Sequence, residues 1–183
     1  MSEAGGERVA KVIARAGLCS RREAEALIEQ GRVTVNGEKL RRAAHNVVPG
    51  DEIVVDGKKL PASERPRLFR FNKPREVLVA TRDPQGRPTI YDGMPAHLPR
   101  LMPVGRLDFN SEGLLLLTND GQLARALEMP STGIVRRYRA RALGRTTQER
   151  LDTLMKGVTV EGVKYGPIEA KLDKAKDGPQ GAN

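Results

Sequence analysis

The chain of 183 residues has one cysteine, two histidines and few aromatic residues. A single cysteine, Cys19, excludes a disulfide framework and a cysteine-based metal site. His45 and His97 are far apart in sequence and show no metal-ligand spacing. No apolar run exceeds four residues, as in Leu114–Leu117, whereas a membrane-spanning helix needs about 20. The N-terminus has no basic segment followed by an apolar one, so no secretory signal is predicted. We therefore expect a cytoplasmic protein with no metal site and no membrane partner.

Positive charge is concentrated in two short segments. The chain carries 32 Lys and Arg against 23 Asp and Glu, a net charge of +9. Residues 61–75 have a net charge of +4 and residues 136–156 a net charge of +5, which accounts for the whole excess. Clustered basic residues are typical of proteins that bind a polyanion such as nucleic acid. The alternative is a basic protein whose charge serves only solubility.

The first 60 residues predict two short helices and a small sheet. The first helix, within residues 7–17, has apolar residues at helical spacing and ends at Gly17. The second begins after Ser20, because Ser20 and Glu23 have the spacing of a capping box, and it ends at Gly31. The strands are expected at residues 32–35 and 53–55, each followed by a strong turn dipeptide, Asn36-Gly37 and Asp56-Gly57.

Two arginines lie in the first turn of the second predicted helix. Arg21 and Arg22 oppose the positive end of the helix dipole, which disfavours the helix. An anion bound there would reverse this effect, since free amides, the dipole and two guanidinium groups would all face it. The alternative is a solvated helix start.

The same region resembles the small RNA-binding domain named after a ribosomal protein of the small subunit, the S-four type. The resemblance lies in three motifs: Ala16 to Ala24, Gly31 to Gly37, and Gly50 to Ile53. It covers roughly residues 7–60 and implies binding to structured RNA, with Arg21, Arg22 and Arg32 as candidate contacts. The resemblance does not by itself imply an enzyme.

The rest of the chain predicts an extended linker and an α+β domain with a mostly antiparallel sheet. The linker spans residues 61–67 and the domain residues 68–183. Helices are expected over residues 121–128 and from Thr147. Strands are expected at residues 68–71, 77–80, 114–117 (buried on both faces), 138–142, 158–160 and 168–172.

Asp108 precedes the most apolar predicted strand. A carboxylate near a core is costly unless it is paired or used, and an ionised, positioned carboxylate can act as a nucleophile or a base. Taken alone, these residues favour a simpler interpretation, in which Asp108 caps the amides of Asn110 or Ser111.

The second domain resembles RNA pseudouridine synthases of the RsuA type, which act on ribosomal RNA. The motifs that carry the resemblance are Lys73-Pro74, Asp83 to Asp92, Pro103 to Gly121, and Arg136 to Arg141 with Gly144. They occur in the family's order, after the RNA-binding module, and the resemblance spans roughly residues 7–173. It identifies the chain as an isomerase that needs no cofactor, metal or energy source.

The resemblance also assigns roles to residues. Asp108 is the essential aspartate, which either attacks ribose carbon-1′ or removes the 2′ proton. Tyr138 corresponds to the tyrosine that stacks on the target uracil. The target uridine must first leave its stack, and Arg106 either fills the vacated space, holds a phosphate or braces the loop. Arg136, Arg137, Arg139 and Arg141 are expected to grip the RNA backbone, although some of them are ordinary solvated residues.

The expected partner is ribosomal RNA or a ribosome assembly intermediate, with large-subunit RNA favoured, and the chain is expected to be a monomer. The family's third motif, a basic residue that pairs with the aspartate, has no match. We therefore expect a C-terminally incomplete domain that lacks strands and ends in a loop over residues 173–183. Arg75-Glu76 stands where the family usually has a glycine.

Two alternatives follow. The chain could be a non-catalytic ribosomal-RNA-binding protein, inactive because the last motif is absent. It could also be a metal-dependent nuclease that uses Asp83, Asp92 and Asp108, which the sequence supports weakly.

Overall fold

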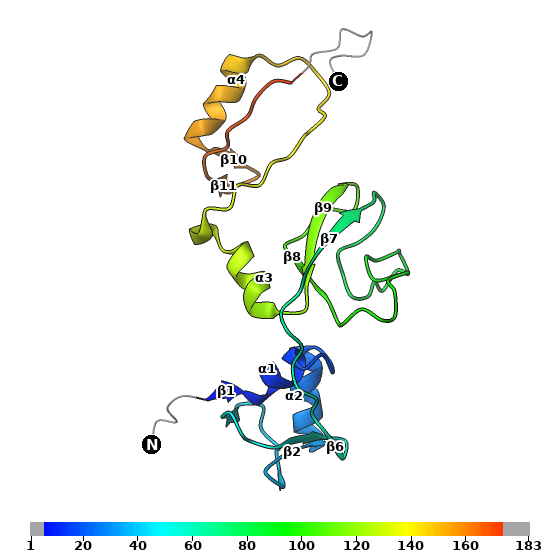
Figure 1. Ribbon diagram of the computed structural model, residues 1–183. Coiled ribbons are helices and arrows are strands. Elements are labelled where there is room, and N and C mark those ends of the chain that lie inside the picture. Colours follow the sequence, from blue (N-terminus) through cyan, green and yellow to red (C-terminus); the bar gives the residue numbers. More distant parts are fainter. Residues whose placement is uncertain (1–5, 174–183) are drawn as a thin grey trace. The chain divides into compact units, whose positions relative to one another are not determined.

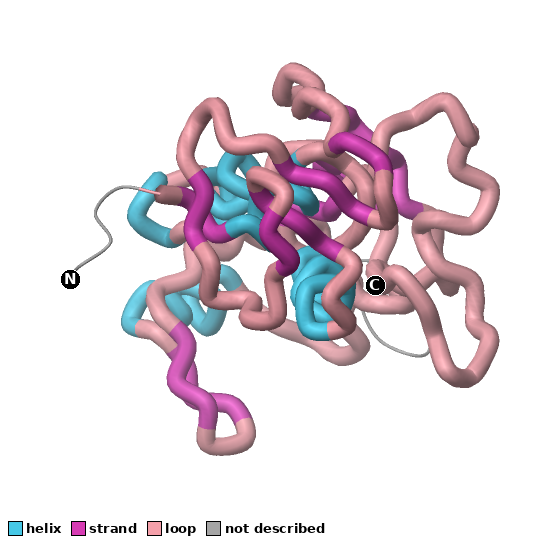
Figure 2. Tube along the Cα trace, turned by 90° about the horizontal axis from the view of Figure 1, so that it is seen from below, coloured by secondary structure: helices cyan, strands magenta, loops and turns pink. Residues whose placement is uncertain are grey.

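The computed structural model describes residues 6–173 and has the predicted α+β fold (Figure 1). The chain divides into two compact units after Ile134. The first unit contains an N-terminal module and a three-stranded sheet, and the predicted linker 61–67 lies within it. Long loops join the short strands, as the pink segments of Figure 2 show. No helix in the part of the chain that the structure describes is long and apolar enough to cross a membrane.

The N-terminal module is built from two helices and small antiparallel sheets. Its elements are β1 (Glu7–Arg8), α1 (Val9–Arg15), α2 (Arg21–Glu29), β2 (Val33–Val35), β3 (Glu38–Lys39), β4 (Asn46–Val47), β5 (Ile53–Val55) and β6 (Lys58–Lys59). The main sheet has the order β3-β2-β5-β6, and β1 pairs with β4. Apolar residues of α1, α2, β2 and β5 form one buried core, with Val9, Ile13 and Ile28 fully buried.

Local sequence signals determine where these elements start and turn. The Ser20 hydroxyl accepts from the Glu23 amide at 3.2 Å, and the Glu23 carboxylate accepts from the Ser20 amide at 2.7 Å. This capping box satisfies two amides that the helix leaves without a partner, and it is the one that the sequence predicts. Both predicted hairpin turns are present, since Asn36-Gly37 and Asp56-Gly57 have positive φ angles.

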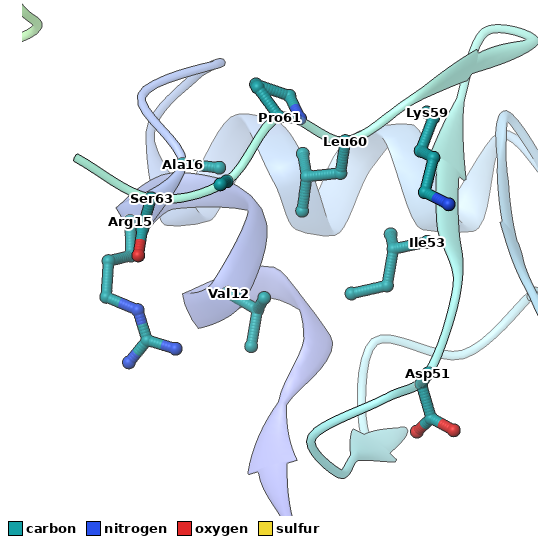
Figure 3. A pocket seen from close by; sticks show the side chains of 10 residues that line it. Val12, Arg15, Ala16, Asp51, Ile53, Lys59, Leu60, Pro61 and Ser63 are labelled. Carbon is teal, nitrogen blue, oxygen red and sulfur yellow. The ribbon is translucent and has the colours of Figure 1, made fainter.

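The start of the linker packs against this module. Residues 60–63 pass over α1 and line a pocket of about 200 Å³ together with Val12, Arg15 and Lys59 (Figure 3). The two cations are engaged elsewhere: Arg15 pairs with Glu7, and Lys59 pairs with Glu52 at 2.8 Å. The pocket is smaller than the roughly 300–1,000 Å³ of ordinary ligand sites, so it is a packing gap beneath the linker.

The remainder of the first unit is a sheet with one covered face. Its elements are β7 (Leu68–Lys73), β8 (Met102–Val104), β9 (Gly113–Thr118), α3 (Gly121–Glu128) and a 3₁₀ turn at Pro130–Thr132. The strand order is β7-β9-β8, and both pairings are antiparallel. Phe69, Phe71, Leu115 and Leu117 share one face and pack with residues of the 77–101 segment, including Ile90 and Leu101. The carboxylate of Asp120 caps α3, because it accepts from the amides of Gln122 and Leu123.

The structure corrects three sequence predictions in this sheet. The 114–117 strand is buried on one face only, because residues alternate along a strand and Leu114 is 66% exposed. The predicted strand at 77–80 is wrong. Leu78 makes one parallel bridge, to Thr89, with Leu78 N donating to Pro88 O and Ile90 N donating to Leu78 O. The short strand β8 was not predicted, because Pro103 at its centre cannot donate to a ladder.

The second unit consists of short, exposed elements. They are α4 (Gln148–Asp152), a 3₁₀ turn (Thr153–Lys156), β10 (Val158–Val160) and β11 (Val163–Tyr165). The helix begins after Thr147, as predicted, and β10 pairs with β11. The predicted strands at 138–142 and 168–172 are wrong: both segments are irregular. Of residues 135–173, none is buried, so the described part of this unit has no apolar core to hold those segments in strands. Of the loop predicted over residues 173–183, all but residue 173 lies outside the described residues.

Candidate active site

Asp108 lies in the loop between β8 and β9, residues 105–112, which we call the Asp108 loop. Its side chain is exposed, and within residues 6–173 the carboxylate makes no hydrogen bond or ion pair. The Ser111 amide donates to the main-chain carbonyl of Asp108 at 3.0 Å, and not to its side chain. The capping interpretation of Asp108 is therefore wrong, and the carboxylate is available for chemistry.

A fully buried lysine holds the Asp108 loop. Lys73, the last residue of β7, is 0% exposed. Its ammonium donates to the main-chain carbonyls of Ser111 at 2.7 Å, Asp108 at 3.0 Å and Phe109 at 3.4 Å, and to Pro74 O at 2.9 Å. Burial lowers the pKa of Lys73, and the negative charge of Asp108 opposes that shift. The lysine thus attaches three carbonyls of the loop to the end of the sheet.

The segment after Lys73 provides a further contact to the same loop. The amide of Glu76 donates to Phe109 O at 2.7 Å. Glu76 has a φ of 62°, in the left-handed region where a residue with a Cβ is strained. A glycine, which the related family usually has here, would adopt this conformation freely. Glu76 keeps the same backbone conformation, but at an energetic cost.

We expect Glu76→Gly to stabilise the protein by up to about 1 kcal/mol, because it relieves the left-handed strain. The matched control is Glu25→Gly, the same change inside α2, which should destabilise by about 1 kcal/mol. Urea unfolding followed by circular dichroism measures both. Equal losses in the two variants would contradict the argument.

A carboxylate and an arginine close the 83–87 turn beside the Asp108 loop. Arg87 donates to both oxygens of Asp83, from Nε at 3.0 Å and from Nη2 at 2.9 Å. The hydrogen bonds from Arg87 lower the pKa of Asp83 to about 2, so the pair is ionised throughout the neutral range. The Arg87 guanidinium lies over the Phe109 ring, 5.9 Å from its centroid.

Two of the three carboxylates of the nuclease interpretation are engaged in other contacts. Asp83 pairs with Arg87, and Asp92 accepts from the Thr89 amide at 2.7 Å. The described part of the chain holds no group of three metal-ligating side chains. This geometry gives the nuclease interpretation no support.

The arginines predicted to contact RNA differ in their surroundings. Arg21 and Arg22 are exposed in the first turn of α2, and neither forms an ion pair with another described residue. Arg32 is held by Asp56 through two hydrogen bonds, of 2.7 and 2.6 Å. Arg106 is exposed in the Asp108 loop.

The remaining predicted site residues lie in the second unit. Tyr138 is 69% exposed, in an irregular segment that also carries the exposed Arg136 and Arg137. Arg139 pairs with Asp173 at 2.9 Å. Asp108 and Tyr138 belong to different units, and the meeting of their side chains stays a prediction.

Sequence reasoning missed three residues of the site: Lys73, Arg87 and Phe109. Each lies in a motif already noted for its resemblance, but only the fold shows that they meet at one loop. Lys73 continues the alternation of Phe69 and Phe71, and this is the local signal that could have indicated a buried ammonium.

Comparison with known proteins finds a match for each of the two predicted domains. Residues 7–53 match the model of the S4 domain, and residues 67–181 match that of RNA pseudouridylate synthase. A Rickettsia felis protein described as an uncharacterized RNA pseudouridine synthase is 42% identical over 92% of this chain and 72% of its own. The ribosomal large subunit pseudouridine synthase B of Bacillus subtilis is 42% identical over 91% of this chain and 68% of its own. The protein of that name in Pseudomonas aeruginosa is 40% identical over 96% and 45%.

A solved pseudouridylate synthase matches the fold with a TM-score of 0.54 and 26% identity, over 90% of this chain and 72% of that one. The fold is thus that of an RNA-modifying isomerase that also carries an RNA-binding domain. The chain belongs to the RNA pseudouridine synthase family, in its RsuA type.

Proposed function

We propose that this chain converts a specific uridine of large-subunit ribosomal RNA into pseudouridine, with Asp108 as the essential residue. The observation that carries the proposal is that the main chain of Asp108 is held in place while its side chain is left unbonded among the described residues. Its main-chain carbonyl is bonded to Lys73 and to the Ser111 amide, whereas its carboxylate is exposed and unengaged within the described residues. Because hydrogen bonds to the main chain hold the backbone of Asp108, its carboxylate is positioned for a reaction and makes no structural hydrogen bond of its own to any described residue.

The reaction breaks the bond between uracil nitrogen-1 and ribose carbon-1′ and forms a bond from carbon-5 to carbon-1′. The uridine first leaves its stack, at a cost of a few kcal/mol. The Asp108 carboxylate then either attacks carbon-1′ or removes the 2′ proton. The base turns and bonds to carbon-1′ through carbon-5, which breaks the Asp108–carbon-1′ bond in the first version and returns the 2′ proton in the second. Carbon-5 then loses its proton and nitrogen-1 gains one, so the product is an isomer of the substrate. We assign Tyr138 to stacking on the uracil, near the place where this proton leaves.

RNA binding is assigned to the arginines that the sequence indicates. Arg21 and Arg22 are the best supported, because both are exposed at a helix start whose amides and dipole attract a phosphate. Arg106, Arg136 and Arg137 are exposed on irregular segments, and so is Arg139, which pairs with Asp173. Arg32 is the least available, since Asp56 holds it. Phosphate contacts of this kind make binding strongly dependent on salt.

The choice of large-subunit RNA is supported by the names of the Bacillus subtilis and Pseudomonas aeruginosa relatives. The test is to incubate the purified chain with transcribed large- and small-subunit ribosomal RNA and map pseudouridine chemically at each position. Pseudouridine at one site of the large-subunit transcript supports the proposal. Pseudouridine only in the small-subunit transcript overturns the choice of substrate. Tight binding without product favours the alternative, a non-catalytic ribosomal-RNA-binding protein.

A further inference from the structure

We propose that Arg87 is a positioning residue for the reaction, which it serves by holding the Phe109 ring and thereby the Asp108 loop. Resting on the proposed function, this inference assigns a role to an ion pair that the reaction scheme does not use. As a positioning residue, Arg87 does not touch the reacting atoms. It acts through Phe109, the residue that directly follows Asp108.

Arg87 is itself fixed in place. Two of its nitrogens bind the two carboxylate oxygens of Asp83, at 3.0 and 2.9 Å, and its own amide donates to Asp83 Oδ2 at 3.0 Å. The Asp83 side chain is 6% exposed and also accepts from the Gln85 amide at 3.2 Å. A planar guanidinium in a two-point contact with a nearly buried carboxylate has a defined plane and position.

Phe109 is in turn held from two sides, through its main-chain carbonyl and through its ring. Its main-chain carbonyl accepts from the Glu76 amide at 2.7 Å and from the Lys73 ammonium at 3.4 Å. The Arg87 guanidinium carbon lies over the half-buried Phe109 ring, 5.9 Å from the ring centroid, which is within the roughly 6 Å range of a cation–π interaction. The carbonyl contacts fix the peptide that follows Phe109, and the ring contact resists rotation about the bonds between Phe109 and Asp108.

The position of the Asp108 loop affects the rate of the proposed reaction. A displacement of about 1 Å at a reacting group can cost about 10²-fold in rate, even when the substituted residue lies away from the chemistry. Within the described residues, the Asp108 carboxylate makes no hydrogen bond or ion pair that would keep it in place. Its position is therefore set by the backbone on either side, and Arg87 supports one of those sides.

Direct contact of Arg87 with RNA phosphate is the competing explanation, because the Arg87 side chain is 45% exposed. The two explanations differ in what the loss of Arg87 changes. A positioning residue affects turnover of bound RNA, whereas a phosphate contact affects affinity and its salt dependence.

The experiment compares Arg87→Ala with Arg82→Ala, the loss of an exposed arginine in the same segment. Amide hydrogen exchange of the full chain, measured by nuclear magnetic resonance, needs no turnover. We expect Arg87→Ala to speed exchange of the Glu76 and Ser111 amides by about tenfold or more, with α2 unaffected, because both amides bond to the Asp108 loop. Unchanged exchange at these two amides would overturn the proposal.

Kinetics provide the second readout. Arg87→Ala should lower kcat by about 10²-fold while KM stays within about threefold. Asp83→Asn should reproduce part of this loss of kcat. In a chain that already carries Phe109→Leu, adding Arg87→Ala should cause no further loss of kcat. A rise in KM with a shallower salt dependence identifies Arg87 as a phosphate contact instead and overturns the proposal. If the unsubstituted chain forms no pseudouridine, the proposed function fails, and hydrogen exchange still decides whether Arg87 holds the loop.

Discussion

Asp108→Asn is expected to reduce pseudouridine formation by about 10⁴-fold or to below detection, with RNA affinity changed by less than about threefold. The substitution replaces one carboxylate oxygen by an amide nitrogen and removes the negative charge. An amide is neither a nucleophile towards carbon-1′ nor a base for the 2′ proton, so both versions of the reaction lose their first step.

The fold should survive this substitution. The contacts that hold Asp108 use its main-chain carbonyl, which accepts from Lys73 and from the Ser111 amide, and both contacts are available to asparagine. The thermal midpoint should therefore lie within about 2 °C of the original, as for an exposed substitution away from packed contacts. Chemical mapping of pseudouridine and a filter-binding isotherm at one salt concentration measure the two expected results.

The matched control is Glu112→Gln, which removes an exposed carboxylate from the same loop. It changes the net charge equally, so it corrects for any effect of charge on RNA binding. Full activity in Glu112→Gln together with none in Asp108→Asn assigns the chemistry to Asp108. Equal activity of the two variants would remove Asp108 from the reaction.

The sequence predicted local features of the fold well and distant pairings badly. The Ser20-Glu23 capping box, the two hairpin turns and the helix start at Thr147 each depend on residues within a few positions of one another, and all are present. The predicted strands at 77–80, 138–142 and 168–172 are absent. A strand exists only where a partner runs beside it, and alternation of apolar residues does not name the partner.

The candidate site shows the same limit. Asp108 was found through a motif in which its neighbours are adjacent in sequence. Lys73 is 35 positions away from it, and their contact depends on β7 pairing with β9, which sets the lysine opposite Gly113. The sequence contained the lysine but could not show that its ammonium lies inside the fold beneath the loop.

Lys73→Met is expected to lower the free energy of unfolding by about 3 kcal/mol and to abolish activity. Methionine has a similar length and keeps the packing of the buried stem, but it removes the ammonium that four carbonyls share. Two effects oppose each other. Loss of a buried charge relieves a desolvation cost, which the lowered pKa of Lys73 reflects. Carbonyls left without a donor cost about 1–3 kcal/mol each where water cannot replace it, so the loss should outweigh the relief.

For a chain of this size, 3 kcal/mol corresponds to a fall of about 6–12 °C in the thermal midpoint, which circular dichroism can follow. The control is Lys58→Met, at an exposed position of the N-terminal module, which should change stability by no more than about 0.5 kcal/mol. Hydrogen exchange separates a local effect from a global one: in Lys73→Met the Ser111 amide should lose protection well before the amides of α2. If Lys73→Met matches Lys58→Met in stability and keeps the Ser111 amide protected, the lysine does not hold the loop. The fixed position of Asp108 would then have to come from Glu76 and Phe109 alone.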